Sequence, residues 1–186
     1  MRNLLAATAL AVFSTATLTA PIWAERAGDL EISKTMLRAT PPGAPVAGGY
    51  VMIENTGATD DTLVSASIDL ETVGRVELHE MRMADGVMSM SEVDGGIAIP
   101  AGETVVLQPG GLHLMLMGLT GPLVPGETHQ VTLTFAQSGE VTMDFPVMTL
   151  GDVRDAFEGA GAMDHGGHGE DHGDGHTADA HSGHGD

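Results

Sequence analysis

The stretch HEMRMADGVMSM (residues 79–90), followed by HLMLM (residues 113–117), indicates how this chain folds. In the first segment His79, Met81 and Met83 share one parity, and in the second a histidine and two methionines alternate with leucines. Side chains of a strand point to opposite faces in turn. The pattern therefore predicts strands that bury their aliphatic residues and turn imidazole and thioether groups outward.

A hairpin is predicted within the first segment, because Asp85-Gly86 is a strong signal for a two-residue turn. A turn at this point pairs Met83 with Met88 and Met81 with Met90. His79 then lies diagonal to Met90 on the same face. Diagonal neighbours are about 7–8 Å apart, so long side chains can meet over one ion.

His113 and Met115 supply a second histidine–methionine pair from another strand. Four neutral nitrogen and sulfur donors suit Cu(I), a soft ion that binds thioethers and imidazole. The alternative is a structural role, since methionines usually fill cores and a single histidine on a strand is more often structural than a ligand. Two observations favour a metal-binding role. Aliphatic residues already occupy the inward face of these strands, and two separate segments each carry His-x-Met.

Residues 1–24 are predicted to be a cleaved secretory signal, with Arg2, an apolar run and the sequence Ile-Trp-Ala before Glu25. An uncleaved membrane anchor is the alternative, but the segment is short for one. The chain contains no cysteine, so a lipid-anchored lipoprotein is not expected. We therefore expect a periplasmic protein without stable membrane association.

Composition narrows the function further. The chain has 26 acidic residues against seven Lys and Arg, for a formal net charge of −19. This charge argues against nucleic acid and anionic membranes as partners. The absence of cysteine excludes disulfides, thiol–disulfide exchange and a cysteine-ligated blue-copper site. No arrangement of nucleophile, acid and base stands out, so we do not expect an enzyme.

The remainder up to residue 150 is predicted to be one all-β domain, residues 25–150, built as a β-sandwich or barrel. Glycine- and proline-containing turns separate short alternating or aliphatic runs, and about 120 residues suffice for one core. The predicted strands are residues 30–33, 50–54, 62–68, 76–83, 87–93, 104–107, 112–119, 130–135 and 141–147.

This domain resembles the periplasmic copper chaperones of the PCu(A)C family. The sequence motif of that family is a histidine, a spacer of ten residues, a methionine, a spacer of about twenty-one residues and then His-x-Met. Here ten residues separate His79 from Met90, twenty-two separate Met90 from His113, and Met115 completes the motif. Flanking segments are similar as well: RATPPGAPVAGGY (38–50), IENTG (53–57) and IPAGETVVLQPGGLHLMLMGL (99–119). The second gap is one residue longer than usual, and Met36 stands where relatives often carry tryptophan.

The resemblance implies a cupredoxin-like Greek-key sandwich. It also implies that His79, Met90, His113 and Met115 bind Cu(I), with Met81, Met83, Met88 and Met117 as neighbours. The expected acceptor is the CuA centre of cytochrome c oxidase, or another copper-assembly protein. The alternative function is a periplasmic copper buffer that confers tolerance and has no dedicated acceptor.

The last part of the chain has a different composition. Residues 151–162 are predicted to be a linker with one possible helical turn at 153–157. Residues 163–186 contain six histidines and six acidic residues but no Lys or Arg, so we expect a disordered tail. Imidazole and carboxylate donors suit Cu(II) or another divalent metal, so we expect the tail to bind one; the alternative is an acidic solubilising extension. Its candidate ligands are His165, His168, His172, His176, His181 and His184.

Overall fold

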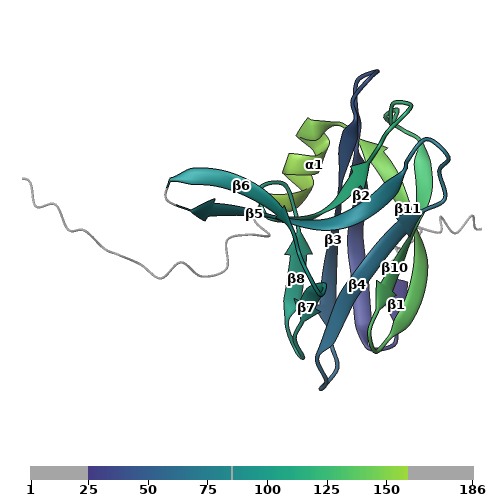
Figure 1. The fold of residues 1–186 in the computed structure, drawn as a ribbon. Helices are drawn as coiled ribbons and strands as arrows, with labels where there is room; N and C mark the ends of the chain where they lie inside the picture. Colours follow the sequence, from purple (N-terminus) through teal and green to yellow (C-terminus); the bar gives the residue numbers. More distant parts are fainter. Residues whose placement is uncertain (1–24, 85, 159–186) are drawn as a thin grey trace, which may run out of the picture.

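Residues 25–84 and 86–158 are described by the structure, a computed structural model. The predicted signal (1–24) and the predicted tail (163–186) lie outside the described residues. The described chain is an all-β sandwich with one helix (Figure 1). Its strands are β1 (Glu25–Ala27), β2 (Leu30–Arg38), β3 (Val46–Asn55), β4 (Asp61–Ile68), β5 (Arg75–Ala84), β6 (Val87–Glu92), β7 (Ile97–Ile99), β8 (Thr104–Leu107), β9 (Leu112–Met117), β10 (Thr128–Phe135) and β11 (Gly139–Met148), followed by helix α1 (Leu150–Phe157).

The strands follow one hydrogen-bonded order, β6-β5-β9-β3-β2-β11-β10-β4-β7, with β1 added to β2 and β8 to β3. β11 joins the two layers: most of it pairs antiparallel with β10, and its end at Val147–Met148 runs parallel to β2. Within the described residues the sheet is not closed, because β6 and β7 end the order. The predicted all-β sandwich is confirmed, and in the described residues it is open and does not close into a barrel.

The main core lies between the layers and is built from the inward-facing residues of the strands other than β6. Ile32, Ile53, Leu63, Leu114 and Phe145 are each fully buried there. Such burial stabilises the fold by about 1.5–3 kcal/mol for each large aliphatic or aromatic side chain. The apolar residues that alternate along the strands in the sequence therefore face this core, and the residues between them face outward.

A β-bulge explains why the first predicted strand was too short. The register of β2 against β3 shifts between Ser33 and Met36, and Lys34 has a φ of 51°. After the bulge, Leu37 points into the main core and Met36 into a second apolar cluster. The bulge breaks the two-residue period, so periodicity alone ended the strand at Ser33.

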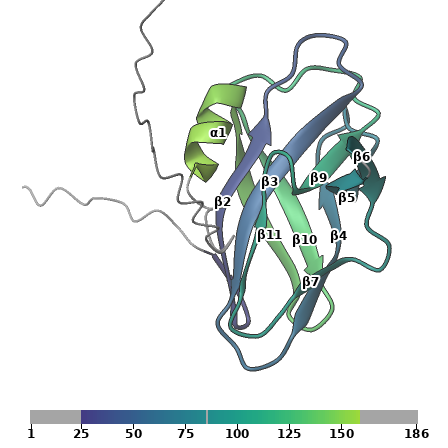
Figure 2. The same ribbon diagram turned by 90° about the vertical axis from the view of Figure 1, so that its left-hand side faces the viewer.

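The second cluster lies under α1, on the outer face of β2 and β3 (Figure 2). Val153 and Phe157 of the helix are buried against Met36 and Tyr50. Residues 151–157, interpreted as the start of a linker, belong to this docked helix, and the helical turn predicted at 153–157 lies within it. The missed signal is Thr149-x-x-Asp152, in which Thr149 caps the helix and bonds the Asp152 side chain.

Candidate metal centre

The predicted hairpin register is confirmed. Met81 lies opposite Met90 and Met83 opposite Met88, which leaves His79 diagonal to Met90. On its other side β5 pairs with β9, and there His79 lies directly opposite His113. The rings of the two histidines are 5.9 Å apart between centroids. β5, β6 and β9 thus bring all four predicted ligands to one face of the sheet.

His113 does not face open solvent, contrary to the sequence-based expectation for this face. Its exposed fraction is only 7%, whereas Met90 is 46% exposed and Met115 is half-buried. Burial, the larger effect, lowers the pKa of His113, and its hydrogen bond to Gly111 opposes this shift. At neutral pH the imidazole is therefore neutral, which is the state that binds metals.

Hydrogen bonding fixes which nitrogen of His113 is available. Nδ1 lies 2.9 Å from the carbonyl oxygen of Gly111, which can only accept, so Nδ1 carries the proton and donates. Nε2 consequently keeps its lone pair. A carbonyl partner on the far nitrogen is the usual way in which proteins orient a metal-binding imidazole.

His79 is held in the opposite tautomer by a residue that the sequence analysis missed. Its Nε2 donates to a carboxylate oxygen of Glu77 at 2.8 Å, and Arg75 donates to the other oxygen. These bonds, from Arg75 first and then from His79, lower the pKa of Glu77 and keep it ionised. Among the described residues, Nδ1 of His79 is one of two buried side-chain atoms without a partner. It is therefore the nitrogen available to an ion.

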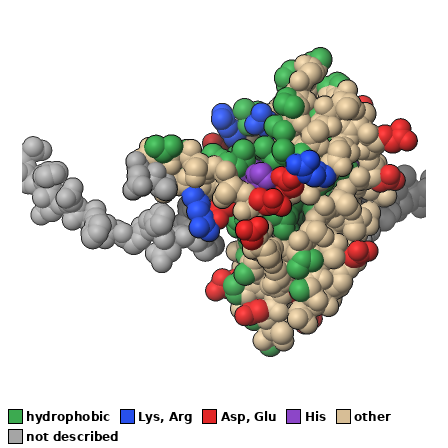
Figure 3. Space-filling model, viewed as in Figure 1, with side chains coloured by type: hydrophobic (Ala, Val, Ile, Leu, Met, Phe, Trp, Pro, Cys, Tyr) green, Lys and Arg blue, Asp and Glu red, His purple; other side chains and the backbone are tan. Residues whose placement is uncertain are grey.

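Glu77 could have been found from parity alone, because it lies two residues before His79 and so shares its face. The register places it opposite Met115 on β9. Its contact with His79 means that Glu77 orients a predicted ligand. Figure 3 shows histidine surface bordered by acidic and basic side chains on this face.

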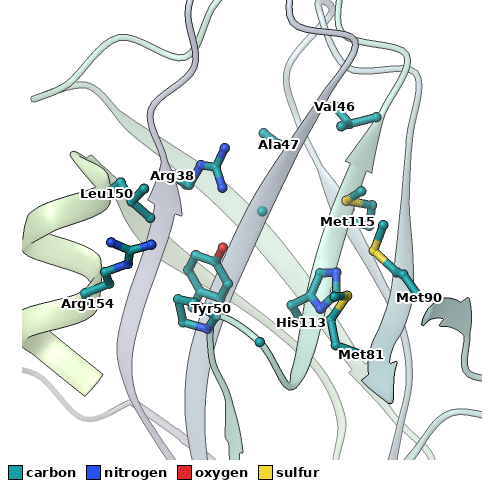
Figure 4. A pocket seen from close by; sticks show the side chains of 13 residues that line it. Arg38, Val46, Ala47, Tyr50, Met81, Met90, His113, Met115, Leu150 and Arg154 are labelled. Atoms are coloured by element: carbon teal, nitrogen blue, oxygen red, sulfur yellow. The ribbon is translucent and has the colours of Figure 1, made fainter. Parts of the chain in front are cut away.

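A cavity of about 290 Å³ opens beside the histidines. His113, Met115 and Met90 line it together with Met81, which was predicted to be only a neighbour (Figure 4). His79 is not among the lining residues. The opposite wall is different in chemistry and includes Tyr50, Arg38, Arg154 and Leu150. One wall therefore offers sulfur and imidazole, and the other offers two guanidinium groups and a phenol.

Tyr50 shapes this cavity through its packing. Burial raises the pKa of Tyr50, against the opposing charge of Arg38, so the phenol stays protonated at neutral pH. Gly48 lies opposite Met115 in the strand pair, and a Cβ there would come within 2.5 Å of the Tyr50 oxygen. The glycine thus leaves room for the ring beside the site.

The donor set is compatible with a soft ion. Within residues 25–84 and 86–158, no three His, Cys, Asp or Glu side chains are arranged to hold a metal by themselves. What this face offers instead is Nδ1 of His79, Nε2 of His113 and methionine sulfur. These donors suit Cu(I) rather than a hard cation. The tail histidines predicted to bind Cu(II) lie outside the described residues.

Comparison with known proteins identifies the family. The sequence model of a family described as "Putative lipoprotein LpqE-like" matches residues 30–147. The chain belongs to the LpqE-like family. A relative, the "Putative lipoprotein Lxx21020" of Leifsonia xyli subsp. xyli (strain CTCB07), is 33% identical over 135 residues, which are 73% of this chain and 79% of the relative. The lipoprotein description belongs to that relative and to the family, whereas this LpqE-like chain contains no cysteine.

Solved structures similar to this LpqE-like chain are PCuAC domains, which confirms the resemblance noted from the motif. The "Apo PCuAC domain from PmoF1" has a TM-score of 0.56 at 26% identity, covering 67% of this chain and 98% of that one. The "Copper-bound PCuAC domain from PmoF2" has a TM-score of 0.55 at 25% identity, covering 67% and 97%. Among the described residues of the chain, no helix is long and apolar enough to cross a membrane.

Proposed function

We propose that this protein is an exported copper chaperone, which holds one Cu(I) ion beside the cavity and passes it on by ligand exchange. The observation that carries the proposal is the pair of oppositely oriented histidines. Each keeps one nitrogen available, and methionine sulfurs lie on the same face. The similarity to PCuAC domains, one of which is described as copper-bound, supports copper as the ion.

The proposed ligands are His79 through Nδ1, His113 through Nε2, and the sulfurs of Met90 and Met115. All four ligand groups are neutral, so no thiolate or carboxylate ligand neutralises the positive charge of the bound ion. Neutral thioether and imidazole donors permit release, which a chaperone requires. Glu77 holds His79 by its other nitrogen and so keeps Nδ1 directed away from the carboxylate.

We test the ligand set by Cu(I) competition against a chromophoric chelator under reducing conditions. Met115→Ile removes a sulfur but keeps the bulk and apolarity, so the fold should be little affected. Affinity should fall at least about tenfold, or about 1.4 kcal/mol. Met117→Ile is the matched control, because Met117 lies two residues further along β9 on the same face. This variant should bind Cu(I) as tightly as the wild type. The assignment is wrong if the two variants exchange these results.

A second pair of variants separates His79 from its neighbour Met81. His79→Gln should weaken Cu(I) binding, and Met81→Ile should leave it nearly unchanged. The opposite outcome would make Met81, which lines the cavity, the fourth ligand in place of His79. Because both side chains share one strand face, the comparison tests the donor and not the location.

The proposed destination is the CuA centre of cytochrome c oxidase in the periplasm, after cleavage of the signal at residues 1–24. A deletion strain grown at limiting copper should contain oxidase with less CuA, and copper supplementation should restore it. Normal CuA content together with lower copper tolerance would identify a buffer instead. The chemistry proposed is transfer of an ion without turnover of a substrate, so no catalytic residue is assigned.

For the tail, we propose that the histidines between 163 and 186 bind Cu(II) or another divalent metal. The test compares the full-length protein with a chain that ends at Glu158, so that α1 stays intact. Loss of most Cu(II) capacity is expected, with Cu(I) affinity retained. If the shortened chain keeps its full Cu(II) capacity, the tail is only an acidic extension.

A further inference from the structure

The β5–β6 hairpin extends away from the body of the sandwich (Figure 1). Every residue of β6 is exposed, so this strand contributes nothing to the main core. Met83 has an exposed fraction of 70% and Met88 one of 48%. Methionine is usually buried, because its flexible thioether fills gaps in cores. These two side chains therefore need an explanation other than packing.

The register arranges four methionines of the hairpin as two successive pairs on one face. Met83 lies opposite Met88, and Met81 lies opposite Met90. Directly opposite residues have Cβ atoms about 4.5–5.5 Å apart, so the two sulfurs of a pair can bind one ion. Met81 and Met90 also line the cavity that contains His113. The outer pair is thus continuous with the inner pair, and the inner pair with the cavity.

The other face of the hairpin differs in character. There Ser89 lies opposite Arg82, and Ser91 lies opposite Glu80. The sulfur atoms are therefore confined to the face that leads to the cavity. An apolar surface for protein docking would need only bulk and would not require methionine in both pairs. Paired thioethers are ligands that suit a soft monovalent ion.

We propose that Met83 and Met88 form a second, outer site for a soft monovalent cation, Cu(I) in the cell. From this site the ion moves inward to Met81 and Met90 and then to the cavity. In each step one metal–sulfur bond forms as another breaks. The ion keeps its single positive charge, and no proton or electron is transferred. The binding step stands on the hairpin alone, whereas the inward movement rests on the function proposed above for the cavity.

The test is a titration of the full-length protein with Ag(I), a redox-inert probe of soft sites, followed through the methionine methyl groups by NMR. The first equivalent should shift the signal of Met115, and the second should shift those of Met83 and Met88. In the double variant Met83→Leu/Met88→Leu, binding of the second equivalent should weaken at least about tenfold, or about 1.4 kcal/mol. The first equivalent should bind unchanged.

Leucine keeps the exposed apolar surface, so the double variant distinguishes thioether binding from protein docking. Met52→Leu is the matched control, since Met52 lies on β3 opposite Ser33 and Val106, away from the hairpin. This control should behave as the wild type. The methyl signals are resolved by residue, so binding elsewhere in the chain does not mimic the expected shifts.

The outcomes separate the two proposals. If Met115 responds but Met83 and Met88 do not, the outer site is refuted and the cavity site stands. If Met83 and Met88 respond but Met115 does not, the function proposed for the cavity fails and the outer site stands. Transfer of Cu(I) from a chelator to the cavity should also be slower in the double variant. An unchanged transfer rate would refute the inward movement.

Discussion

Replacing Phe157 with alanine tests the part of the structure that the sequence predicted least well. The ring has an exposed fraction of 6% and packs edge-on against Tyr50, with 6.2 Å between ring centroids. Lys34 lies 5.8 Å from the ring centroid and donates to the carbonyl oxygen of Ala156 at 2.9 Å. These contacts fix α1 on the outer face of β2 and β3.

The expected loss follows from burial. Replacement of a buried phenylalanine with alanine costs about 3–5 kcal/mol, including the cavity left behind. Here the helix can undock instead of holding an empty space, so the loss cannot exceed the free energy of docking. We therefore expect about 3 kcal/mol, the lower end of this range. Undocking would also open the cavity, because Leu150 and Arg154 form part of its wall.

The measurement is urea unfolding followed by circular dichroism, with stability from linear extrapolation. Asp155→Ala, on the exposed side of the same helix, is the matched control and should change stability little. A chain ending at Leu150 should lose at least as much stability as Phe157→Ala, and a chain ending at Glu158 should lose none. The reasoning is refuted if Phe157→Ala costs less than about 1 kcal/mol, because the docking of α1 would then contribute little to stability. It is also refuted if the chain ending at Leu150 is as stable as the one ending at Glu158.

Three further predictions follow from single contacts. Asp61 is buried and accepts hydrogen bonds from three backbone N–H groups, those of Thr62, Gln137 and Ser138. Burial alone would raise the pKa of Asp61, but hydrogen bonding from the Ser138 side chain and from these backbone groups holds it below its ordinary value of 3.8. The ionised Asp61 carboxylate therefore stabilises the fold above pH 3.8, and this stabilisation is lost as the pH falls further. The substitution Asp61→Asn should cost about 2 kcal/mol at pH 7, measured by urea unfolding. The neighbouring change Asp60→Asn, which affects one exposed bond, should cost less. Burial lowers the pKa of His113 below 6.5, so as the pH falls this imidazole is protonated in the unfolded chain before it is protonated in the folded one. Stability should therefore fall as the pH drops below 6.5. A variant His113→Gln that shows the same pH dependence would contradict this. Thr149→Ala should cost about 1 kcal/mol in thermal or urea unfolding, because it removes the N-cap of α1.

Sequence alone was sufficient for the hairpin and its register. The turn signal at Asp85-Gly86 and the two-residue period of Met81 and Met83 permit one pairing that keeps the thioethers on one face. A slip of one residue would move every side chain to the other face, so the pattern fixes the register. The same local logic predicted the strands that carry His79 and His113. It failed for β1 and β7, since three residues are too few to show alternation.

Only the tertiary structure decided what surrounds these residues. Strand parity places Glu77 and His79 on one face, but their hydrogen bond depends on side-chain conformation and on the charge of Arg75. The burial of His113 depends on neighbours distant in sequence, and so does the cavity that Met81 shares with Tyr50. α1 is amphipathic over only eight residues, and it is held by packing on β2 and β3. A short helix gains most of its stability from such packing, so its place in the domain could not be read from its own residues.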